Sequence, residues 1–241
     1  MGCGCVGPSK DKYSIENILG EKIQEPKDIT SKYIITEYVK KVFNLINRIR
    51  VNPPEFVNVI ETAEKYIKDN NGRKIFDDNK IKVSLNEGKT MFQDCANYLK
   101  NLQPMEELNF CDDIVLECPK DDKNIKDINY FKEKVLEKKE KFGIEAYFKD
   151  SIRIPEISVL LMLVDDSAKN PRRKREALLN PKYKFIGISS SDVNNNDKNE
   201  VKKNNDLNDE KKKINEGANN NIERIIRSEL NKSFCAYFAL K

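Results

Sequence analysis

The chain has 241 residues, of which 38% are hydrophobic and 35% are charged, so we expect one folded domain with polar tails. Its 44 basic and 40 acidic side chains leave a formal net charge of +4, too balanced for the cationic field of a nucleic-acid-binding protein, and no nucleic-acid partner is predicted. The chain contains no histidine. A histidine-dependent nucleophile, a histidine-ligated zinc ion and a pH switch near neutrality are therefore excluded for the chain acting alone.

The first residues, MGCGCVGPSKDK, resemble a signal for double acylation. Gly2 is the candidate site of N-myristoylation, and Cys3 and Cys5 are the candidate sites of palmitoylation. Two acyl chains matter because one myristoyl group binds a membrane only marginally. Val6 stands where the usual template has Ser or Thr. We predict a flexible tail over residues 1–30 that anchors the chain to the cytosolic face of a membrane; the alternative is a cytoplasmic chain with ordinary thiols.

Three amphipathic helices are predicted in the first half of the chain. The stripe in TEYVKKVFNLINRIRV indicates a helix capped by Thr36. A second helix is expected to start at Asn52-Pro53, with Asn52 as its cap, and to run to the Asn-Asn-Gly turn at 70–72. NEGKTMFQDCANYLKNL predicts a third helix that stops before Pro104.

Periodicity is less clean in the second half. YFKEKVLEKKEKFG predicts a charged helix ending at Gly143, whereas the continuous apolar run in ISVLLMLVDD fits a helix or a strand. KFIGIS and SFCAYFALK predict strands. Between them, residues 192–221 are mostly Asn, Lys, Asp and Glu, and we predict a disordered insertion there. The folded domain is therefore expected to comprise residues 31–191 and 222–241.

The remaining four cysteines, Cys95, Cys111, Cys118 and Cys235, are predicted to be reduced, because no secretory signal is readable at the N-terminus. The spacing from Cys111 to Cys118 fits no zinc pair, so these side chains are interpreted as small hydrophobic residues. No apolar run approaches the 18 residues expected of a transmembrane helix.

A cluster of four cations, Arg172, Arg173, Lys174 and Arg175, precedes a short apolar pair and an Asn-Pro turn. Two interpretations remain open. Such a cluster at the C-terminal part of a helix or in a loop is usually a solvated surface. Alternatively, Lys169, Arg172 and Arg173 form a basic patch for acidic lipids or an acidic protein partner, and Lys174 and Arg175 belong to a binding site.

Several stretches together resemble the CAP superfamily, also called SCP or PR-1-like. FNLINRIRVNPPEF is similar to the opening "N-x-x-R-x-x-P-x-x-F" helix of that family, LNEGKTMFQDCANYL to its "EG" element, and DDSAKNPRRKREALLNPKYKFIGIS to its Asp-Asp, "HR", "LLNP" and strand series. SFCAYFALK resembles the closing strand. The matches span residues 43–240 with gaps.

The resemblance implies an α+β fold, a three-layer α-β-α sandwich, with a cleft where the family usually places two His and two Glu around a metal. In this alignment Lys174 takes the position of the "HR" histidine, Arg175 is retained, and Glu145 in FGIEAYF is similar to the acidic residue of the "gEN" motif. Protonated lysine has no lone pair to give to zinc. We therefore expect a degenerate cleft with no metal or cofactor, in which Lys174, Arg175 and Glu145 hold an anion or an internal carboxylate.

Three functions follow as hypotheses. The first is a non-catalytic binding or scaffolding domain tethered to a membrane. The second, which rests on family analogy, is a carrier of lipid or sterol. The third is a hydrolase with Lys174 as general base, which is disfavoured because no G-x-S-x-G or S-x-x-K motif supplies a nucleophile.

Overall fold

The computed structural model describes residues 29–78, 80–119, 124–125, 127–166, 170–191 and 234–241. Its centre is a four-stranded mixed sheet with the order β4-β6-β7-β5, in which β4 is parallel to β6 and β7 is antiparallel to both of its neighbours. The strands are β4 (Asn109–Phe110), β5 (Ala146–Asp150), β6 (Phe185–Ser190) and β7 (Ala236–Leu240). Helices and a second, antiparallel sheet complete an α+β fold, as the sequence predicted.

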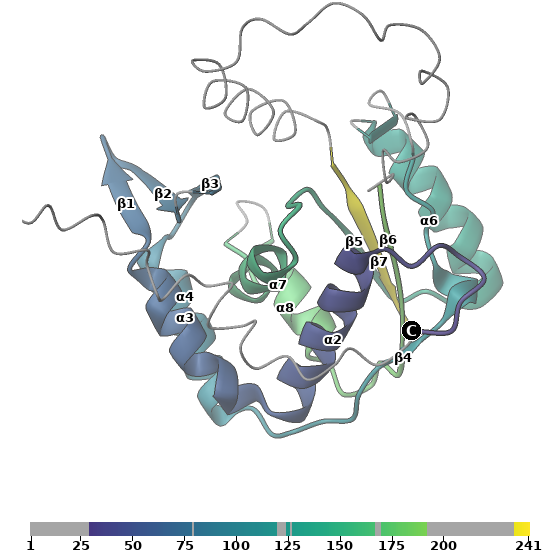
Figure 1. The fold of residues 1–241 in the computed structure, drawn as a ribbon, viewed down its shortest axis with the longest axis horizontal. Helices are drawn as coiled ribbons and strands as arrows, with labels where there is room; N and C mark the ends of the chain where they lie inside the picture. Colours follow the sequence, from purple (N-terminus) through teal and green to yellow (C-terminus); the bar gives the residue numbers. More distant parts are fainter. Residues whose placement is uncertain (1–28, 79, 120–123, 126, 167–169, 192–233) are drawn as a thin grey trace, which may run out of the picture.

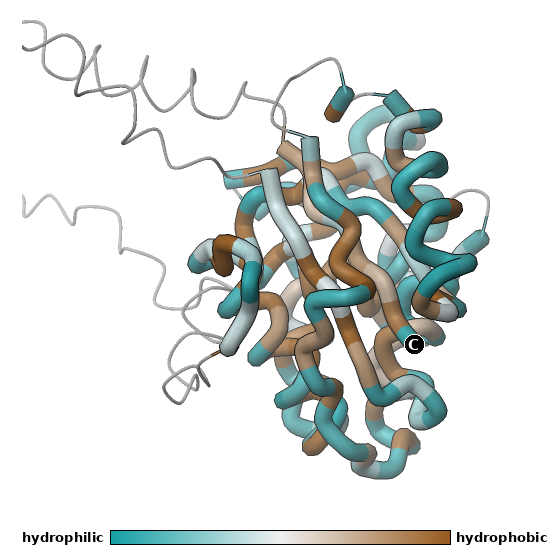
Figure 2. The backbone as a smooth tube through the Cα atoms, turned by 90° about the vertical axis from the view of Figure 1, so that its right-hand side faces the viewer, coloured by the Kyte–Doolittle hydropathy of each residue, from teal (hydrophilic) through white to brown (hydrophobic). Residues whose placement is uncertain are grey.

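Helices lie on both sides of this sheet (Figure 1). Along β7, Ala236, Phe238 and Leu240 pack into the main core, which also contains α2 (Glu37–Val51) and α7 (Pro155–Val164). The alternate residues, Cys235, Tyr237 and Ala239, pack into a second cluster with α6 (Ile128–Phe142). Successive side chains of a strand point to opposite faces, so β7 is apolar along its whole length because both of its faces are covered. Figure 2 shows this as hydrophobic colour along the sheet.

The predicted helices of the first half are confirmed, with one correction. Helix α2 begins after Thr36, whose hydroxyl accepts a hydrogen bond from the Val39 amide at 3.2 Å. After the 3₁₀ turn η1 (Pro53–Phe56), helix α3 (Val57–Glu64) ends before the predicted limit at 70–72, and the Asn52 side chain makes no capping bond. Helix α4 (Lys89–Asn101) ends before Pro104, as expected.

A three-stranded antiparallel sheet stands where the sequence predicted the end of the second helix. It consists of β1 (Ile67–Asn70), β2 (Arg73–Asp77) and β3 (Lys82–Leu85). Asn71 and Gly72 both have positive φ, 53° and 78°, as a two-residue turn between antiparallel strands requires. The Asn-Gly pair was the signal for this hairpin, and the helical spacing of Ile67 was misleading because Ile67 pairs with Phe76 across the sheet.

The structure settles the elements left open or missed in the second half. The apolar run in ISVLLMLVDD belongs to helix α7 (Pro155–Val164). Eight of the ten residues of this helix are buried, and the other two, Pro155 and Leu161, are half-buried. Helix α6 ends at Gly143, which adopts the left-handed conformation (φ 69°). The strands predicted from KFIGIS and SFCAYFALK are β6 and β7, and β5 was not foreseen. The predicted insertion at 192–221 and the tail at 1–28 lie outside the described residues.

Two residues of the N-x-x-R motif join distant segments. Asn47 accepts a hydrogen bond from the Leu108 amide at 2.8 Å and donates to the Leu108 carbonyl at 3.0 Å. Arg50, fully buried, donates to the carbonyls of Glu106, Leu178, Asn180 and Tyr183 at 2.7–3.2 Å. Helix α2 thereby holds the chain before β4 and the chain before β6 at the same end of the sheet.

Candidate functional site

The cationic cluster opens a short helix, α8 (Arg173–Leu178), that follows α7. Asp165, the C-cap residue of α7, is buried and has a left-handed backbone conformation (φ 45°). Its carboxylate accepts the Lys174 amide at 2.7 Å, and its carbonyl accepts the Arg172 amide at 3.1 Å. The cluster therefore spans the end of a loop and the start of α8, with Arg172 and Arg173 exposed. The solvated interpretation allowed a loop or the C-terminal part of a helix, and the structure shows the loop.

Lys174 points to a buried carboxylate. Its ammonium nitrogen lies 3.4 Å from Asp150 Oδ1, and the Asp150 side chain is 6% exposed against 27% for Lys174. The second Asp150 oxygen accepts the Ser158 hydroxyl at 2.7 Å and the Ile152 amide at 3.1 Å. Ser158 in turn contacts the Tyr38 hydroxyl at 2.8 Å. Lys174 is therefore paired with a carboxylate of the protein itself.

Arg175 takes part in a different arrangement, with residues of α4. Its side chain is 2% exposed, donates to Asp94 Oδ2 at 2.5 Å and lies 5.0 Å from the Tyr98 ring. Arg172 donates two hydrogen bonds to the same carboxylate, at 3.0 and 3.1 Å. Burial acts to raise the pKa of Asp94, but the hydrogen bonds from Arg175 and Arg172 outweigh it, and the pKa is lowered. Asp94 therefore stays ionised and locks α8 to α4.

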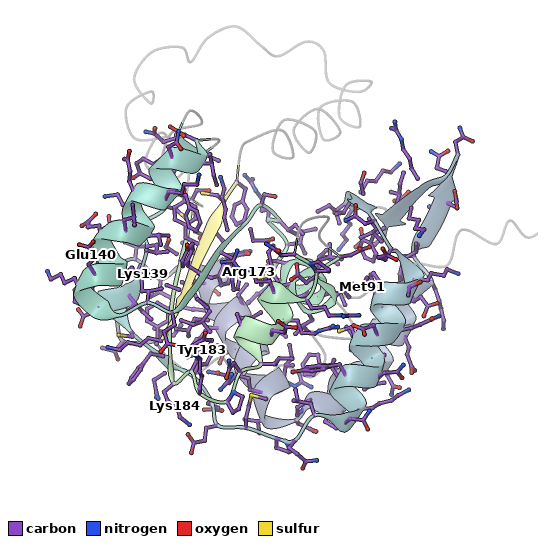
Figure 3. The ribbon with its side chains drawn as sticks, turned by 180° about the vertical axis from the view of Figure 1, so that it is seen from behind. Met91, Lys139, Glu140, Arg173, Tyr183 and Lys184 are labelled. Carbon is purple, nitrogen blue, oxygen red and sulfur yellow. The ribbon has the colours of Figure 1, made fainter. Side chains whose placement is uncertain are left out.

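The other predicted residues do not join Lys174. Glu145 precedes β5 and pairs with Lys182 at 2.5 Å, whereas Lys174 contacts Asp150 at the opposite end of the same strand. Arg173 lies over the Tyr147 ring at 5.6 Å (Figure 3 labels Arg173 at the start of α8). Lys169 is outside the described residues. The cleft of Lys174, Arg175 and Glu145 inferred from the resemblance is thus divided among three separate contacts.

A pocket of about 510 Å³ opens beside Lys174. One wall comes from β3 and the residue before it, a second from the chain after β5, and a third from the end of α7. Its polar or charged lining residues are Lys82, Ser84, Asp150, Ser151, Asp165, Asp166 and Lys174, and its apolar lining residues are Ile81, Val83, Leu85, Ile152, Leu161 and Val164. The pocket is therefore amphipathic, with charges and an apolar surface in contact with the same space.

The charged groups around this pocket have partners within the protein. Asp166 accepts the backbone amides of Asn86, Glu87 and Gly88 at 2.8–3.1 Å and so holds the turn that leads into α4. Lys82 lies 3.5 Å from Asp77. Burial raises the pKa of Asp165, although the Lys174 amide and nearby cations act in the opposite direction.

Sequence reasoning missed the acidic half of the site. Asp150 is 24 residues from Lys174 in the chain, and Asp94 is 81 residues from Arg175. No local spacing marks either carboxylate as a partner. The Asp165-Asp166 pair was noticed within the family-like series, but the residues that it binds could not be assigned from the sequence.

The four cysteines described by the structure carry free thiols. Cys95 and Cys235 are buried, and Cys111 and Cys118 are half-buried. Burial raises the pKa of Cys95 to about 11, which makes it an inert core residue. Within the described parts of the chain, no three His, Cys, Asp or Glu side chains gather in a group that could hold a metal ion.

Comparison of the chain with protein-family models, curated proteins and solved structures gives no match. Among the helices that the structure describes, none has the length and apolar character needed to cross a membrane.

Proposed function

We propose that this protein is a non-catalytic binding or scaffolding domain whose ligand site is the pocket beside Lys174, held at the cytosolic face of a membrane by acyl groups on its N-terminal tail. The observation that carries the binding proposal is that the ionisable groups lining this amphipathic pocket are already engaged by the protein itself.

A catalytic acid or base must be free to exchange a proton with a substrate. In the pocket, Asp150 accepts three donors, Asp165 accepts the Lys174 amide, and Asp166 accepts three backbone amides. Groups held in this way are suited to orient a ligand, and their positions are set before it arrives. This supports recognition over the hydrolase hypothesis, in which Lys174 would act as a base.

For the fold, we propose the three-layer α-β-α sandwich of the CAP type. The support is the distribution of the core: one apolar cluster on the face of β7 toward α2 and α7, and a second on the face toward α6. Further support comes from the motif positions, because Asn47 and Arg50 anchor loops and Pro53 and Phe56 are buried.

The membrane tether rests on Gly2, Cys3 and Cys5, which lie outside the described residues. Metabolic labelling with an alkyne myristate tests it directly. We expect label and membrane pelleting in the wild type and loss of both in Gly2→Ala. Equal pelleting of the two proteins would contradict the tether and leave the cytoplasmic alternative.

Of the proposed basic patch, Arg172 and Arg173 are exposed, but Arg172 is neutralised by Asp94. Each free surface charge near an anionic leaflet contributes about 1 kcal/mol. Neutralising this charge by Arg173→Gln is therefore expected to weaken binding of the unacylated chain to phosphatidylserine vesicles only slightly, within about fivefold. A larger loss would give the patch a main role in attachment.

A second candidate function, a carrier of lipid or sterol, is favoured by the six apolar side chains in the pocket wall. The two candidates differ in what the pocket holds. Lipid extraction and native mass spectrometry of the purified full chain would identify a bound apolar molecule in a carrier, whereas a scaffold is expected to bind a peptide or protein partner.

Two matched substitutions test the pocket. Leu161→Lys places an ammonium in the pocket wall, and Leu136→Lys makes the same change on α6, where Leu136 is 60% exposed. We expect Leu161→Lys to abolish binding of the apolar molecule or peptide partner that the wild type holds, and Leu136→Lys to leave that binding unchanged. Binding that survives Leu161→Lys would place the ligand elsewhere on the molecule.

A further inference from the structure

Cys118 and Cys235 lie together on the α6 side of the sheet. The Cys118 thiol donates a hydrogen bond to the Cys235 carbonyl oxygen at 3.5 Å, and both residues pack in the apolar cluster on this face. Cys235 is fully buried next to the first residue of β7, and Cys118 is half-buried in the chain that follows η2 (Asp112–Ile114). Two thiols that are 117 residues apart in the chain thus meet at one end of the central sheet.

Ser189 of β6 fixes the position of Cys118. Its hydroxyl donates to the Leu116 carbonyl at 2.5 Å, accepts the Cys118 amide at 3.1 Å and lies 3.3 Å from the Cys118 sulfur. On the other side, Ser191 and Cys235 exchange two hydrogen bonds, each 2.9 Å long. The Cys118 thiol and the Cys235 backbone are therefore both fixed by hydrogen bonds, and little conformational freedom remains to be lost when the two residues are joined.

The two thiols differ in acidity. The hydrogen bond from Cys118 lowers the pKa of Cys235, even though burial opposes this, and the Ser191 hydroxyl and the charge of Lys149 act in the same direction as Cys118. Burial raises the pKa of Cys118. Cys235 is therefore the thiolate that closes the bridge, and Cys118 is the more accessible sulfur that Cys235 attacks once Cys118 carries half of a small disulfide.

We propose that Cys118 and Cys235 form a reversible disulfide when the protein meets a low-molecular-weight disulfide. Cys118 reacts first because it is the accessible thiol of the pair. It loses its proton and attacks one sulfur of that oxidant, a step that its raised pKa slows; the oxidant's S–S bond breaks, one half stays attached to Cys118, and the other half leaves and takes up the Cys118 proton. The Cys235 thiolate then attacks the Cys118 sulfur and releases the second half, which takes up the Cys235 proton. Two protein thiols are oxidised and one small disulfide is reduced to two thiols.

The bridge would connect the segment after η2 to the beginning of β7. Because it closes a long loop of the unfolded chain, the oxidised protein is expected to melt at a higher temperature than the reduced one, by about 5 °C. Reduction by excess small thiol would restore the original melting temperature.

Equilibration of the purified full chain in glutathione and glutathione disulfide at fixed ratios tests the proposal. After acid quench, alkylation and trypsin digestion, the expected product joins peptide 101–120 to peptide 233–241. The first peptide contains both Cys111 and Cys118, so Cys111→Ser is the matched control. The joined peptide should persist in Cys111→Ser and disappear in Cys118→Ser.

Cys118→Ser is the decisive variant because Cys118 is half-buried and a serine hydroxyl can take over its contacts; circular dichroism of this variant verifies that it is folded. Its melting temperature should be the same in oxidising and reducing buffer. The proposal is overturned if the wild type stays reduced in glutathione disulfide alone, or if the joined peptide persists in Cys118→Ser.

Discussion

Two arginines illustrate how individual residues gain their roles in this molecule. Arg50 and Arg175 are 0% and 2% exposed. Arg50 binds four backbone carbonyls, and burial lowers its pKa to about 10, so it remains charged at neutral pH. Arg175 binds a carboxylate, and the contacts with Asp94 and Cys95 outweigh the effect of burial on its pKa, which is raised. Arg50 is therefore a structural hub, whereas Arg175 closes an ion pair beside the candidate site.

Replacement of Arg50 by Met should be among the most destabilising single changes. The substitution roughly keeps the side-chain volume but removes the donors for four carbonyls, and we expect a loss of about 3 kcal/mol or more in the free energy of unfolding. Lys40→Met on the same helix, which breaks only an exposed pair with Glu37, should cost about 0.5 kcal/mol or less. Urea denaturation followed by circular dichroism measures both. Equal losses would contradict the hub role.

Replacing the buried Asp165 by Asn is expected to increase the free energy of unfolding at neutral pH but not at acidic pH. Burial raises its pKa in the folded state. The stability that this carboxyl contributes is therefore complete below its unfolded pKa, near 3.9, and is lost as the pH rises through the folded value. Asp165→Asn keeps an acceptor for the Lys174 amide and suits the left-handed backbone. We expect the variant to be more stable than the wild type at pH 7 and equally stable near pH 3.5.

The neighbouring Asp166 is the control for this prediction. Its carboxylate accepts three backbone amides, so Asp166→Asn should lower stability at pH 7, in contrast to Asp165→Asn. Unfolding free energies measured at several pH values distinguish the two. A loss of stability in both variants at pH 7 would show that Asp165 is favourably ionised.

At the scale of elements, sequence patterns correctly predicted the helices whose residues interact mainly with near neighbours in the chain. The one-sided stripes of α2, α4 and α6 and the end of α6 at Gly143 were readable, because side-chain spacing and caps act within a few residues. The hairpin of β1 and β2 and the strand β5 were not predicted. Their residues become strands through partners elsewhere, as with the pairing of β5 and β7.

The contact between β6 and η2 leads to a prediction about Gly187. A Cβ at this position would lie 2.8 Å from the backbone of Ile114 and Val115, which cannot move aside as a flexible side chain could. Gly187→Ala should therefore destabilise the fold by about 1–3 kcal/mol. Ser190→Ala, in the half-buried end of the same strand, is the control and should cost about 1 kcal/mol or less. Thermal unfolding compares the two, and unchanged stability of Gly187→Ala would mean that η2 can shift.

At the scale of the whole molecule, the two ends of the segment between β6 and β7 meet. Ser190 and Ala236 are paired in the sheet, and Ser191 is hydrogen-bonded to Cys235. The sheet therefore closes as a hairpin whatever length of chain connects these strands, since loop-closure entropy changes slowly with length.

Deletion of residues 192–221 is accordingly expected to leave the domain folded, with a free energy of unfolding within about 1 kcal/mol of the wild type. Circular dichroism and urea denaturation of the shortened chain provide the measurement. Loss of cooperative unfolding would mean that these residues contribute to the core and that the predicted insertion is wrong.

By itself, the sequence determined the chain's chemical limits and many of its local elements: the absence of histidine, the amphipathic helices and the strands β6 and β7. Only the tertiary structure decided that Lys174 meets Asp150, that Arg172 and Arg175 share Asp94, and that Cys118 lies against Cys235. The physical reason is the distance along the chain over which the interactions act. Helix periodicity and caps act over a few residues, whereas these pairs join residues 24 to 117 positions apart, which become neighbours only when the core packs.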